Sequence, residues 1–322
     1  MAQKVVVTGG TGWLGGAVVK ALLARGHTVV AADVAVNPAF AALANAEPAL
    51  TAVSVDLADA AGISALLMSV KPDAIVHCAA IVGVANCAVN PAKAYRVNVE
   101  GTVNLFEAAC LAGIKRVVNV STEETYGDFQ SAVIGEDHPQ NPTSIYGATK
   151  LASEQIGRVY ARQYGMECIN VRTCWVYGPD LPRPRMPKTY IDAALKGEPL
   201  HISTGGDLAV DQVYIDDTVQ GVVLALEKEH HRFDAYNVAT GEAPTVSEVA
   251  QIVNAAIPGA DIRVDPGPYY PSEGIVSAKK GALDISRARV ELGYAPQFSI
   301  LKGMEKMIEL SRAELSNRSI DK

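Results

Sequence analysis

Short apolar runs rich in Val and Ile alternate with helical patterns through the first half of the chain, and this alternation constrains the fold more than any other feature. Six runs bounded by Gly, Pro or charge are predicted as strands: residues 4–8, 27–33, 50–56, 73–78, 115–121 and 167–173. Segments with apolar residues at helical spacing, such as 14–26 and 99–113, lie between them and end in Gly. Strands that are apolar on both faces need helices on both sides of the sheet. The sequence therefore predicts an α/β fold with a doubly wound parallel sheet.

The composition excludes several classes of protein. The chain of 322 residues is 49% apolar and 20% charged, as expected of a globular protein, and its net charge of −7 argues against a nucleic-acid partner. Its apolar runs are strand-length, so neither a membrane span nor a secretion signal is expected. The five cysteines are scattered (Cys78, Cys87, Cys110, Cys168 and Cys174). They favour free thiols in a reducing cytoplasm over disulfides or metal ligands.

A glycine-rich turn, VTGGTGWLGG, follows the first predicted strand and opens the first helix. Gly9, Gly12 and Gly15 are spaced three apart and enclose Trp13 and Leu14, and Gly10 completes a G-x-G-x-x-G string with the last two. Such glycines allow a tight turn, close approach of a pyrophosphate to the backbone and close helix–strand packing. The amino terminus of the helix then offers N–H groups to the phosphates. The turn predicts a Rossmann-type dinucleotide site.

Two aspartates end the next two predicted strands. Asp33 ends the second, where a carboxylate binds the adenosine ribose and repels a 2′-phosphate. No Arg or Lys follows it in VAVNPAF, so NAD is favoured over NADP. Asp56 ends the third strand and either binds the adenine amino group or caps a helix.

A tyrosine and a lysine, Tyr146 and Lys150, lie four residues apart in SIYGATKLASEQ and share one face of a predicted helix. A phenol normally titrates near pH 10, too high for a base at neutrality. A neighbouring ammonium and a positive nicotinamide ring favour the phenolate, so this pair suits proton transfer. Thr122 or Ser121, at the end of the fifth strand, can then hydrogen-bond the reacting oxygen of the substrate.

These motifs together resemble the extended short-chain dehydrogenase/reductase family, which includes NAD-dependent sugar epimerases and dehydratases. The matching pieces cover most of the chain: Thr8-Gly9-x-x-Gly12-x-x-Gly15, Asp33, Asp56-Leu57, HCAA (His77 to Ala80), Asn98, Thr122, Tyr146-x-x-x-Lys150, VYGP, YIDD and LGYAP. The resemblance implies that Tyr146 is the acid/base, that Lys150 anchors the nicotinamide ribose, and that Thr122 orients the substrate hydroxyl. It also implies that Cys78, Ala79 and Ala80 line the dinucleotide. Asn98 then either supports the site or is purely structural.

The sequence departs from the members of this family that act on nucleotide sugars. Those enzymes usually carry an Asn where this chain has Trp175, an Arg where it has Val210, and an Arg-Pro-Gly-Asp-like stretch where it has YYPSEG. Five basic residues could replace the missing cations or could simply lie on solvated loops: Arg183, Arg185, Lys188, Lys279 and Lys280. A small polyhydroxylated or carboxylated substrate is therefore favoured, with a nucleotide sugar as the alternative.

Two adjacent glutamates, Glu123 and Glu124, occupy the place where the related 4,6-dehydratases carry an Asp-Glu acid/base pair. An elimination needs one carboxyl protonated and the other ionised. Without the diphosphate clamp, the sequence favours another interpretation. In that interpretation Glu124 touches a substrate hydroxyl while Glu123 faces solvent or caps a turn.

The organisation expected along the chain is an NAD-binding region and a substrate-binding region. Residues 1–172 form the first, with 211–240 returning to it, and residues 173–210 and 241–322 form a smaller mixed α/β substrate region. Proline-rich segments at 177–187 and 265–271 are predicted to be loops that shape the pocket. No metal site is expected, since His230 and His231 lie at a charged helix end.

The predicted function is an NAD(H)-dependent oxidoreductase or epimerase acting by hydride transfer at a secondary alcohol or ketone of a small hydroxy substrate. The alternative is a UDP- or TDP-sugar 4-epimerase or 4,6-dehydratase with recycled NAD. A third possibility is a non-catalytic NAD-sensing protein, but the presence of Thr122, Tyr146 and Lys150 together argues against it. Family resemblance implies a homodimer formed through two long helices of each subunit, one of which carries Tyr146.

Overall fold

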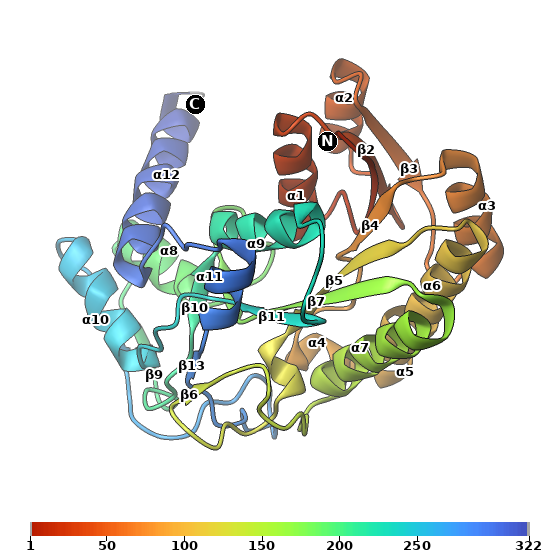
Figure 1. Ribbon diagram of the computed structural model, residues 1–322. Helices are drawn as coiled ribbons and strands as arrows, with labels where there is room; N and C mark the ends of the chain where they lie inside the picture. The colour runs from red at the N-terminus through yellow and green to blue at the C-terminus, as the bar shows by residue number, and fades with distance from the viewer. Residues whose placement is uncertain (1, 321–322) are drawn as a thin grey trace.

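The computed structural model describes residues 2–320, and its centre is a seven-stranded parallel sheet in the order β11-β7-β5-β4-β1-β2-β3 (Figure 1). The strands are β1 (Lys4–Thr8), β2 (Thr28–Asp33), β3 (Leu50–Ser54), β4 (Ala74–His77), β5 (Arg116–Thr122), β7 (Glu167–Thr173) and β11 (Ala235–Val238). All six predicted strands belong to this sheet, and β11 extends it beyond β7. The predicted α/β fold with a parallel sheet is confirmed.

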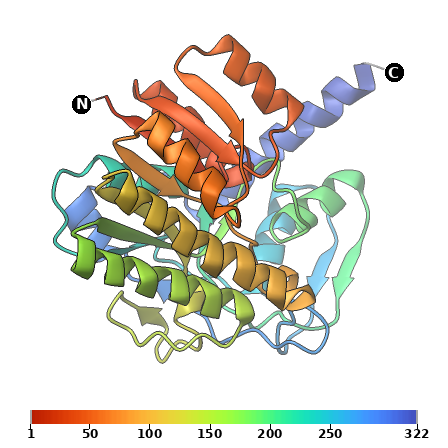
Figure 2. The ribbon, with the colours of Figure 1, turned by 90° about the vertical axis from the view of Figure 1, so that its right-hand side faces the viewer.

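Alternate side chains of the central strands enter two separate cores. Val5 and Val7 of β1 pack into one core, and Val6 between them packs into the other. The first core receives α1 (Trp13–Ala24) and α9 (Ile215–Glu227), whereas the second receives α3 (Ala60–Val70) and α6 (Gly101–Leu111). The long helix α7 (Ile145–Tyr164) lies beside α6, and Figure 2 shows these two helices in front of the sheet. Helices on both faces explain why the strands are apolar throughout.

The remaining elements build the part of the molecule that lies beyond the β7 side of the sheet. Short parallel pairs join β8 (Trp175–Tyr177) to β10 (Gln212–Tyr214), β9 (Leu200–Ile202) to β12 (Ile262–Val264), and β6 (Val133–Ile134) to β13 (Ala282–Leu283). The helices here are α8 (Lys188–Lys196), α10 (Val246–Ala256), α11 (Ser286–Leu292) and α12 (Ile300–Ile320). Figure 1 shows α8, α10 and α12 grouped away from β1, β2 and β3.

The order of the strands reverses between β1 and β4, because β2 and β3 are added on one side of β1 and β4, β5 and β7 are added on the other. In open α/β sheets a crevice forms outside the carboxyl ends of the strands at such a point. The glycine turn follows β1, the loop from Cys78 follows β4, and the two glutamates follow β5. The order of the strands therefore brings three of the predicted motifs to one edge.

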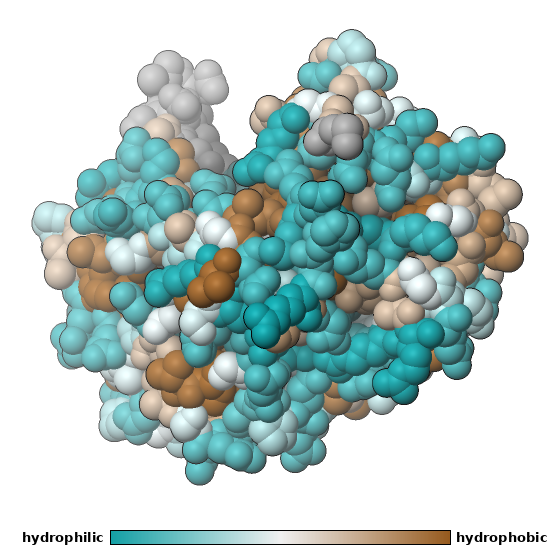
Figure 3. Space-filling view, in the orientation of Figure 1, coloured by the Kyte–Doolittle hydropathy of each residue, from teal (hydrophilic) through white to brown (hydrophobic). Residues whose placement is uncertain are grey.

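The surface seen in Figure 3 is mostly hydrophilic, with small scattered apolar patches. Within residues 2–320, no helix is both long enough and apolar enough to span a membrane. The short connecting helices are α2 (Pro38–Ala46), α4 (Val84–Val89), α5 (Pro91–Tyr95), a π-helix at Arg96–Glu100 and a 3₁₀ turn at Glu123–Thr125.

Candidate active site

A cavity of about 960 Å³ lies at the carboxyl edge of the sheet, between the glycine turn and the loops around residues 181–185 and 269–278. It is lined by every predicted site residue except Asn98: Gly9, Gly12, Trp13, Leu14, Gly15, Asp33, Asp56, Leu57, Cys78, Ala79, Ala80, Ser121, Thr122, Glu123, Glu124, Tyr146, Lys150 and Trp175. Both proline-rich loops contribute to its wall, as predicted from their composition.

The glycine turn has the close packing that a dinucleotide site requires. Gly9 has a φ of +66°, and a Cβ there would lie 2.8 Å from the backbone of Ala79. A Cβ on Gly15 would lie 2.1 Å from the Gly9 carbonyl oxygen. Gly12 is the N-cap of α1, and because it has no side chain, no side-chain cap occupies the first N–H groups of the helix. The unobstructed amino terminus of α1 and the lack of Cβ atoms fit a pyrophosphate held against the backbone.

The carboxylate of Asp33 is held in place at the end of β2. Its Oδ2 accepts hydrogen bonds from the Thr11 backbone N–H at 3.2 Å and from the Thr11 hydroxyl at 3.1 Å. Asp56 is exposed and lines the cavity, and its Oδ1 accepts from the Ala58 N–H at 2.9 Å. The N-cap of α3 is Asp59, so the alternative that Asp56 caps this helix is wrong.

Asn98 lies behind the loop that follows β4. Its side chain accepts from the Ile81 N–H at 2.7 Å and donates to the Ile81 carbonyl at 3.0 Å and to the Thr149 hydroxyl at 3.0 Å. It is 1% exposed. Asn98 therefore ties this loop to α7 without lining the cavity. Among the residues expected at the cofactor, it is the one placed outside the wall.

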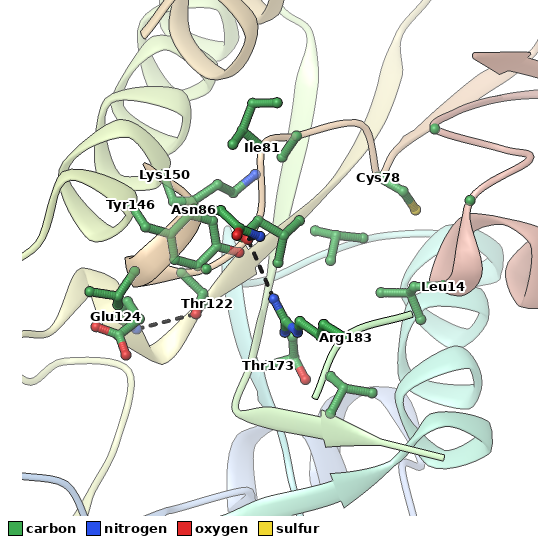
Figure 4. A pocket seen from close by; sticks show the side chains of 18 of the residues that line it. Leu14, Cys78, Ile81, Asn86, Thr122, Glu124, Tyr146, Lys150, Thr173 and Arg183 are labelled. Atoms are coloured by element: carbon green, nitrogen blue, oxygen red, sulfur yellow. Dashed lines mark hydrogen bonds between the residues drawn. The ribbon is translucent and has the colours of Figure 1, made fainter. Parts of the chain in front are cut away.

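Helix α7 brings Tyr146 and Lys150 to the cavity (Figure 4). Ser144 caps its amino terminus by accepting from the Gly147 N–H, and a Cβ on Gly147 would lie 2.4 Å from the Glu124 carbonyl oxygen. Because Gly147 has no side chain, α7 can approach the end of β5 closely. Burial lowers the pKa of Lys150 to about 8, against the Glu154 carboxylate. Burial raises the pKa of Tyr146, and the charge of Arg183 is the main opposing influence.

The two hydroxyls at the end of β5 have different surroundings. Ser121 donates to Glu154 Oε1 at 2.5 Å, and Glu154 in turn forms a fully buried ion pair with Arg172 at 2.7 Å. Thr122 accepts from the Glu124 N–H at 3.3 Å, the contact drawn in Figure 4. Its hydroxyl has only a long contact of 3.5 Å, to Glu123. Of the two, Thr122 is therefore the better placed to donate to a ligand.

Both glutamates after β5 are buried, which corrects the expectation that Glu123 faces solvent. Glu123 is 2% exposed and Glu124 is 9% exposed. The buried ammonium of Lys280 lies 3.1 Å from Glu124 Oε1 and 3.9 Å from Glu123 Oε1. Burial raises the pKa of Glu123 to about 7, against the charge of Lys280. The site thus holds one ion-paired carboxylate beside one that titrates near neutrality.

The expectation of solvated loops fails for three of the five basic residues. Arg183 and Arg185 line the cavity, and Lys280 is buried against the glutamates. Lys188 instead pairs with Asp192 on its own helix, and Lys279 is exposed. Asn86 and Thr173 also line the cavity, and the sequence does not predict them there because neither belongs to a recognisable motif.

Metal ligands do not gather in the described part of the chain. Within residues 2–320 there is no group of three or more His, Cys, Asp or Glu side chains placed to hold an ion. His231 bonds the Tyr236 hydroxyl and the Ala225 carbonyl, which is a structural role. The five cysteines are unpaired.

The fold and the cavity define a dinucleotide-dependent oxidoreductase class of enzyme. Comparison with known proteins then gives the family. The sequence model of the "NAD dependent epimerase/dehydratase family" matches residues 5–239. The chain belongs to this family, and its cofactor is NAD.

Three relatives illustrate the similarity. UDP-glucose 4-epimerase of Mycolicibacterium smegmatis is 33% identical over 96% of this chain and 99% of its own length. Among solved structures, UDP-glucose 4-epimerase of Thermotoga maritima is 27% identical with a TM-score of 0.86, covering 97% of this chain and 99% of that one. The dTDP-glucose 4,6-dehydratase DesIV of Streptomyces venezuelae, solved with NAD bound, is 32% identical with a TM-score of 0.84, covering 96% and 97%.

Proposed function

We propose that the chain oxidises a secondary alcohol of a sugar-like substrate by hydride transfer, with Tyr146 as the acid/base, and can return the hydride to the resulting ketone. The observation that carries this proposal is that Tyr146, Lys150 and Thr122 line the same cavity as the glycine turn. In this arrangement a substrate hydroxyl beside Tyr146 and Thr122 lies next to the place where a dinucleotide would bind.

The protein residues manage the proton of the substrate hydroxyl. Thr122 donates a hydrogen bond to the substrate oxygen, and Tyr146 removes the proton from it. NAD held at the glycine turn would supply the hydride acceptor, and its positive ring would favour the Tyr146 phenolate. Lys150, held at the cavity wall by burial in α7, adds positive charge beside the phenol. Nearby cations are needed to favour the phenolate, because burial raises the pKa of the Tyr146 phenol and the charge of Arg183 opposes that effect.

The fate of the ketone decides the reaction. A ketone that leaves makes the enzyme a dehydrogenase, and one that is retained and reduced from its other face makes it an epimerase. The relatives are named as 4-epimerases of UDP-glucose and a 4,6-dehydratase of dTDP-glucose, which supports a sugar ring as the reacting unit. We therefore favour epimerisation at a sugar carbon with NAD recycled.

A second candidate is the elimination of water from the oxidised substrate. It is supported by the buried pair Glu123 and Glu124, because one carboxyl titrates near neutrality and the other is paired with Lys280. In this reading Glu123 delivers a proton to the departing hydroxyl, and Glu124 takes the proton from the neighbouring carbon. A product lighter by one water in mass spectrometry would distinguish elimination from epimerisation.

The acid/base assignment is tested by substituting the phenol. Incubation of the enzyme with NAD and a panel of sugars, sugar acids and nucleotide sugars is followed by NADH absorbance and by NMR of the products. Tyr146→Phe should lower turnover by about 10²- to 10⁴-fold. The matched control is Tyr270→Phe, since Tyr270 is 46% exposed. Turnover by Tyr146→Phe equal to that of the control would refute the assignment.

The regional division, the oligomer and the location are further parts of the proposal. Residues 173–210 and 241–322 would form the substrate side, a division supported by the presence of Trp175, Arg185 and Tyr269 in the cavity wall. A homodimer through α6 and α7 is supported by exposed apolar side chains on these helices, Leu111 at 69% and Val159 at 48%, and sedimentation velocity would measure it. Five unpaired thiols support the cytoplasm as the location.

A further inference from the structure

Two arginines in the cavity wall, Arg183 and Arg185, have no carboxylate partner among the described residues. Arg183 makes one long hydrogen bond, from Nη1 to the Val82 carbonyl at 3.4 Å (Figure 4), and its Nε is buried without an acceptor. Arg185 stacks on the ring of Trp175, with its Cζ 3.8 Å from the ring centroid. No hydrogen bond or ion pair holds its guanidinium in the described structure.

The absence of a directly paired carboxylate distinguishes the two from the other largely buried arginines, although the charges of Glu123 and Glu124 do reach Arg185 from farther away. Arg116, Arg172 and Arg287 each pair with a glutamate. By contrast, Arg183 and Arg185 lie close enough to repel each other, and burial together with the Arg183 charge lowers the pKa of Arg185 to about 10. Two cations held together beside a cavity are unfavourable unless an anion binds between or beside them.

A third unused donor lies beside the arginines. Trp175 lines the cavity and is 6% exposed. Its Nε1 is buried and has no hydrogen-bond acceptor within the described residues. Tyr269 packs against the same indole, with ring centroids 5.4 Å apart. The indole is therefore fixed between Arg185 and Tyr269. Its position gives the arginine a rigid support for binding a planar anion.

The position of these donors relates the anion to the reacting part of the substrate. Arg183 is the cation that most affects the Tyr146 phenol, and Figure 4 shows its side chain extending toward Tyr146 across the cavity. Arg185 affects the Glu123 carboxyl at the end of β5. An anion bound between the arginines would therefore lie on the Tyr146 and Glu123 side of the cavity, close to the reacting carbon.

We propose that Arg183, Arg185 and Trp175 form a carboxylate-binding subsite, and that the substrate is a sugar acid or a similar polyhydroxylated acid whose carboxylate is close to the reacting carbon. This inference rests on the proposed function, because it assumes that the reacting carbon lies beside Tyr146. Guanidinium groups bind carboxylates through paired N–H donors, and such charge-assisted bonds exceed those to a neutral hydroxyl. A neutral hexose would leave both arginines without a counter-charge.

Calorimetric titration of the NAD-loaded enzyme tests the subsite. The probes are uronates and aldonates, each beside its neutral sugar or alditol, with the corresponding sugar phosphates and UDP-glucose as further arms. At least one acid should bind tenfold or more tightly than its neutral counterpart. Arg183→Met or Arg185→Met should reduce that preference by about 10- to 100-fold. Arg263→Met is the matched control, because the Arg263 side chain is 71% exposed and does not line the cavity.

Several results would overturn the inference. They are no preference for any acid, a stronger preference for sugar phosphates, tight UDP-glucose binding that both arginine variants keep, or an equal loss for acids and neutral sugars. Thermal unfolding and NAD binding show whether each variant is folded, and Arg185→Lys should restore part of the preference because it keeps the charge. The failure of the proposed function has a different signature. In that case Tyr146→Phe would still turn over substrate, whatever the binding data show.

Discussion

Replacing Glu123 with glutamine should change the way the stability of the protein depends on pH. Glu123 is 2% exposed, and burial raises the pKa of its carboxyl from the ordinary 4.5 to about 7. Between these two values the folded chain keeps a proton on Glu123 that the unfolded chain releases. The free energy of unfolding therefore falls as the pH rises through this range, since the folded state binds more protons. Glutamine at this position has no such proton.

The size of the effect follows from the two pKa values. Linkage with 4.5 in the unfolded chain and about 7 in the folded chain gives a loss of about 2–3 kcal/mol in the contribution of Glu123 between pH 5 and pH 8. The stability of Glu123→Gln relative to the wild type should rise by that amount over the same interval. Lys280 opposes the shift, so Lys280→Met should raise this pKa further and extend the loss above pH 7.

Urea unfolding at a series of pH values, followed by circular dichroism, measures these differences. Groups away from the site contribute equally to the wild type and the variant, so the difference between the two curves reports Glu123 together with the charges it interacts with, Lys280 and Glu124. Glu229→Gln is the control, because the Glu229 side chain is 89% exposed and its substitution should leave the curve parallel to that of the wild type. A Glu123→Gln curve that also stays parallel to the wild type would show that the carboxyl ionises normally.

Two further predictions concern the structure around the site. Glu154→Gln removes the charge that pairs with Arg172, which is 1% exposed, and should lower the free energy of unfolding by about 3–5 kcal/mol in urea titrations. Replacement of both members of the pair by apolar residues should recover most of that loss. A loss below about 1 kcal/mol in the single variant would contradict the reasoning. Gly15→Ala places a Cβ 2.1 Å from the Gly9 carbonyl oxygen and should weaken NAD binding at least tenfold by calorimetry. The control is Gly113→Ala, where no atom lies within 4 Å of the new Cβ. Its φ of +73° makes alanine strained there, so stability should fall while the affinity for NAD stays that of the wild type.

The positions of the residues proposed to bind the cofactor could be predicted because they depend on local sequence. The turn after β1 needs glycines at fixed spacing, and Gly9 and Gly15 occupy positions that a Cβ would block. Asp33 ends its strand where the pattern places it, and Tyr146 and Lys150 lie on one face of a single helix. In each case the requirement is met within one strand, one turn or one helix, so the order of residues carries the information.

The surroundings of Glu123 could not be predicted in the same way. Two adjacent glutamates in a short turn follow the usual pattern of a solvated loop, and the expectation of an exposed carboxyl used that pattern. Glu123 is instead buried, because α7 closes over the turn through Gly147 and because Lys280 arrives from a distant part of the chain. A buried charge needs a partner. Local sequence does not show where that partner comes from.

The same physical difference separates the prediction of the reaction class from that of the substrate. Hydride chemistry depends on groups within single elements, whereas recognition of a substrate depends on loops such as 181–185 that have no periodicity. In the sequence, Arg183 and Arg185 are indistinguishable from solvated loop residues. Their common place in the cavity wall without a directly paired carboxylate, and the stacking of Arg185 on Trp175, support the proposal of an anionic ligand. A charged residue in an irregular loop therefore becomes evidence about a substrate when it lines a cavity and no carboxylate pairs with it directly among the described residues.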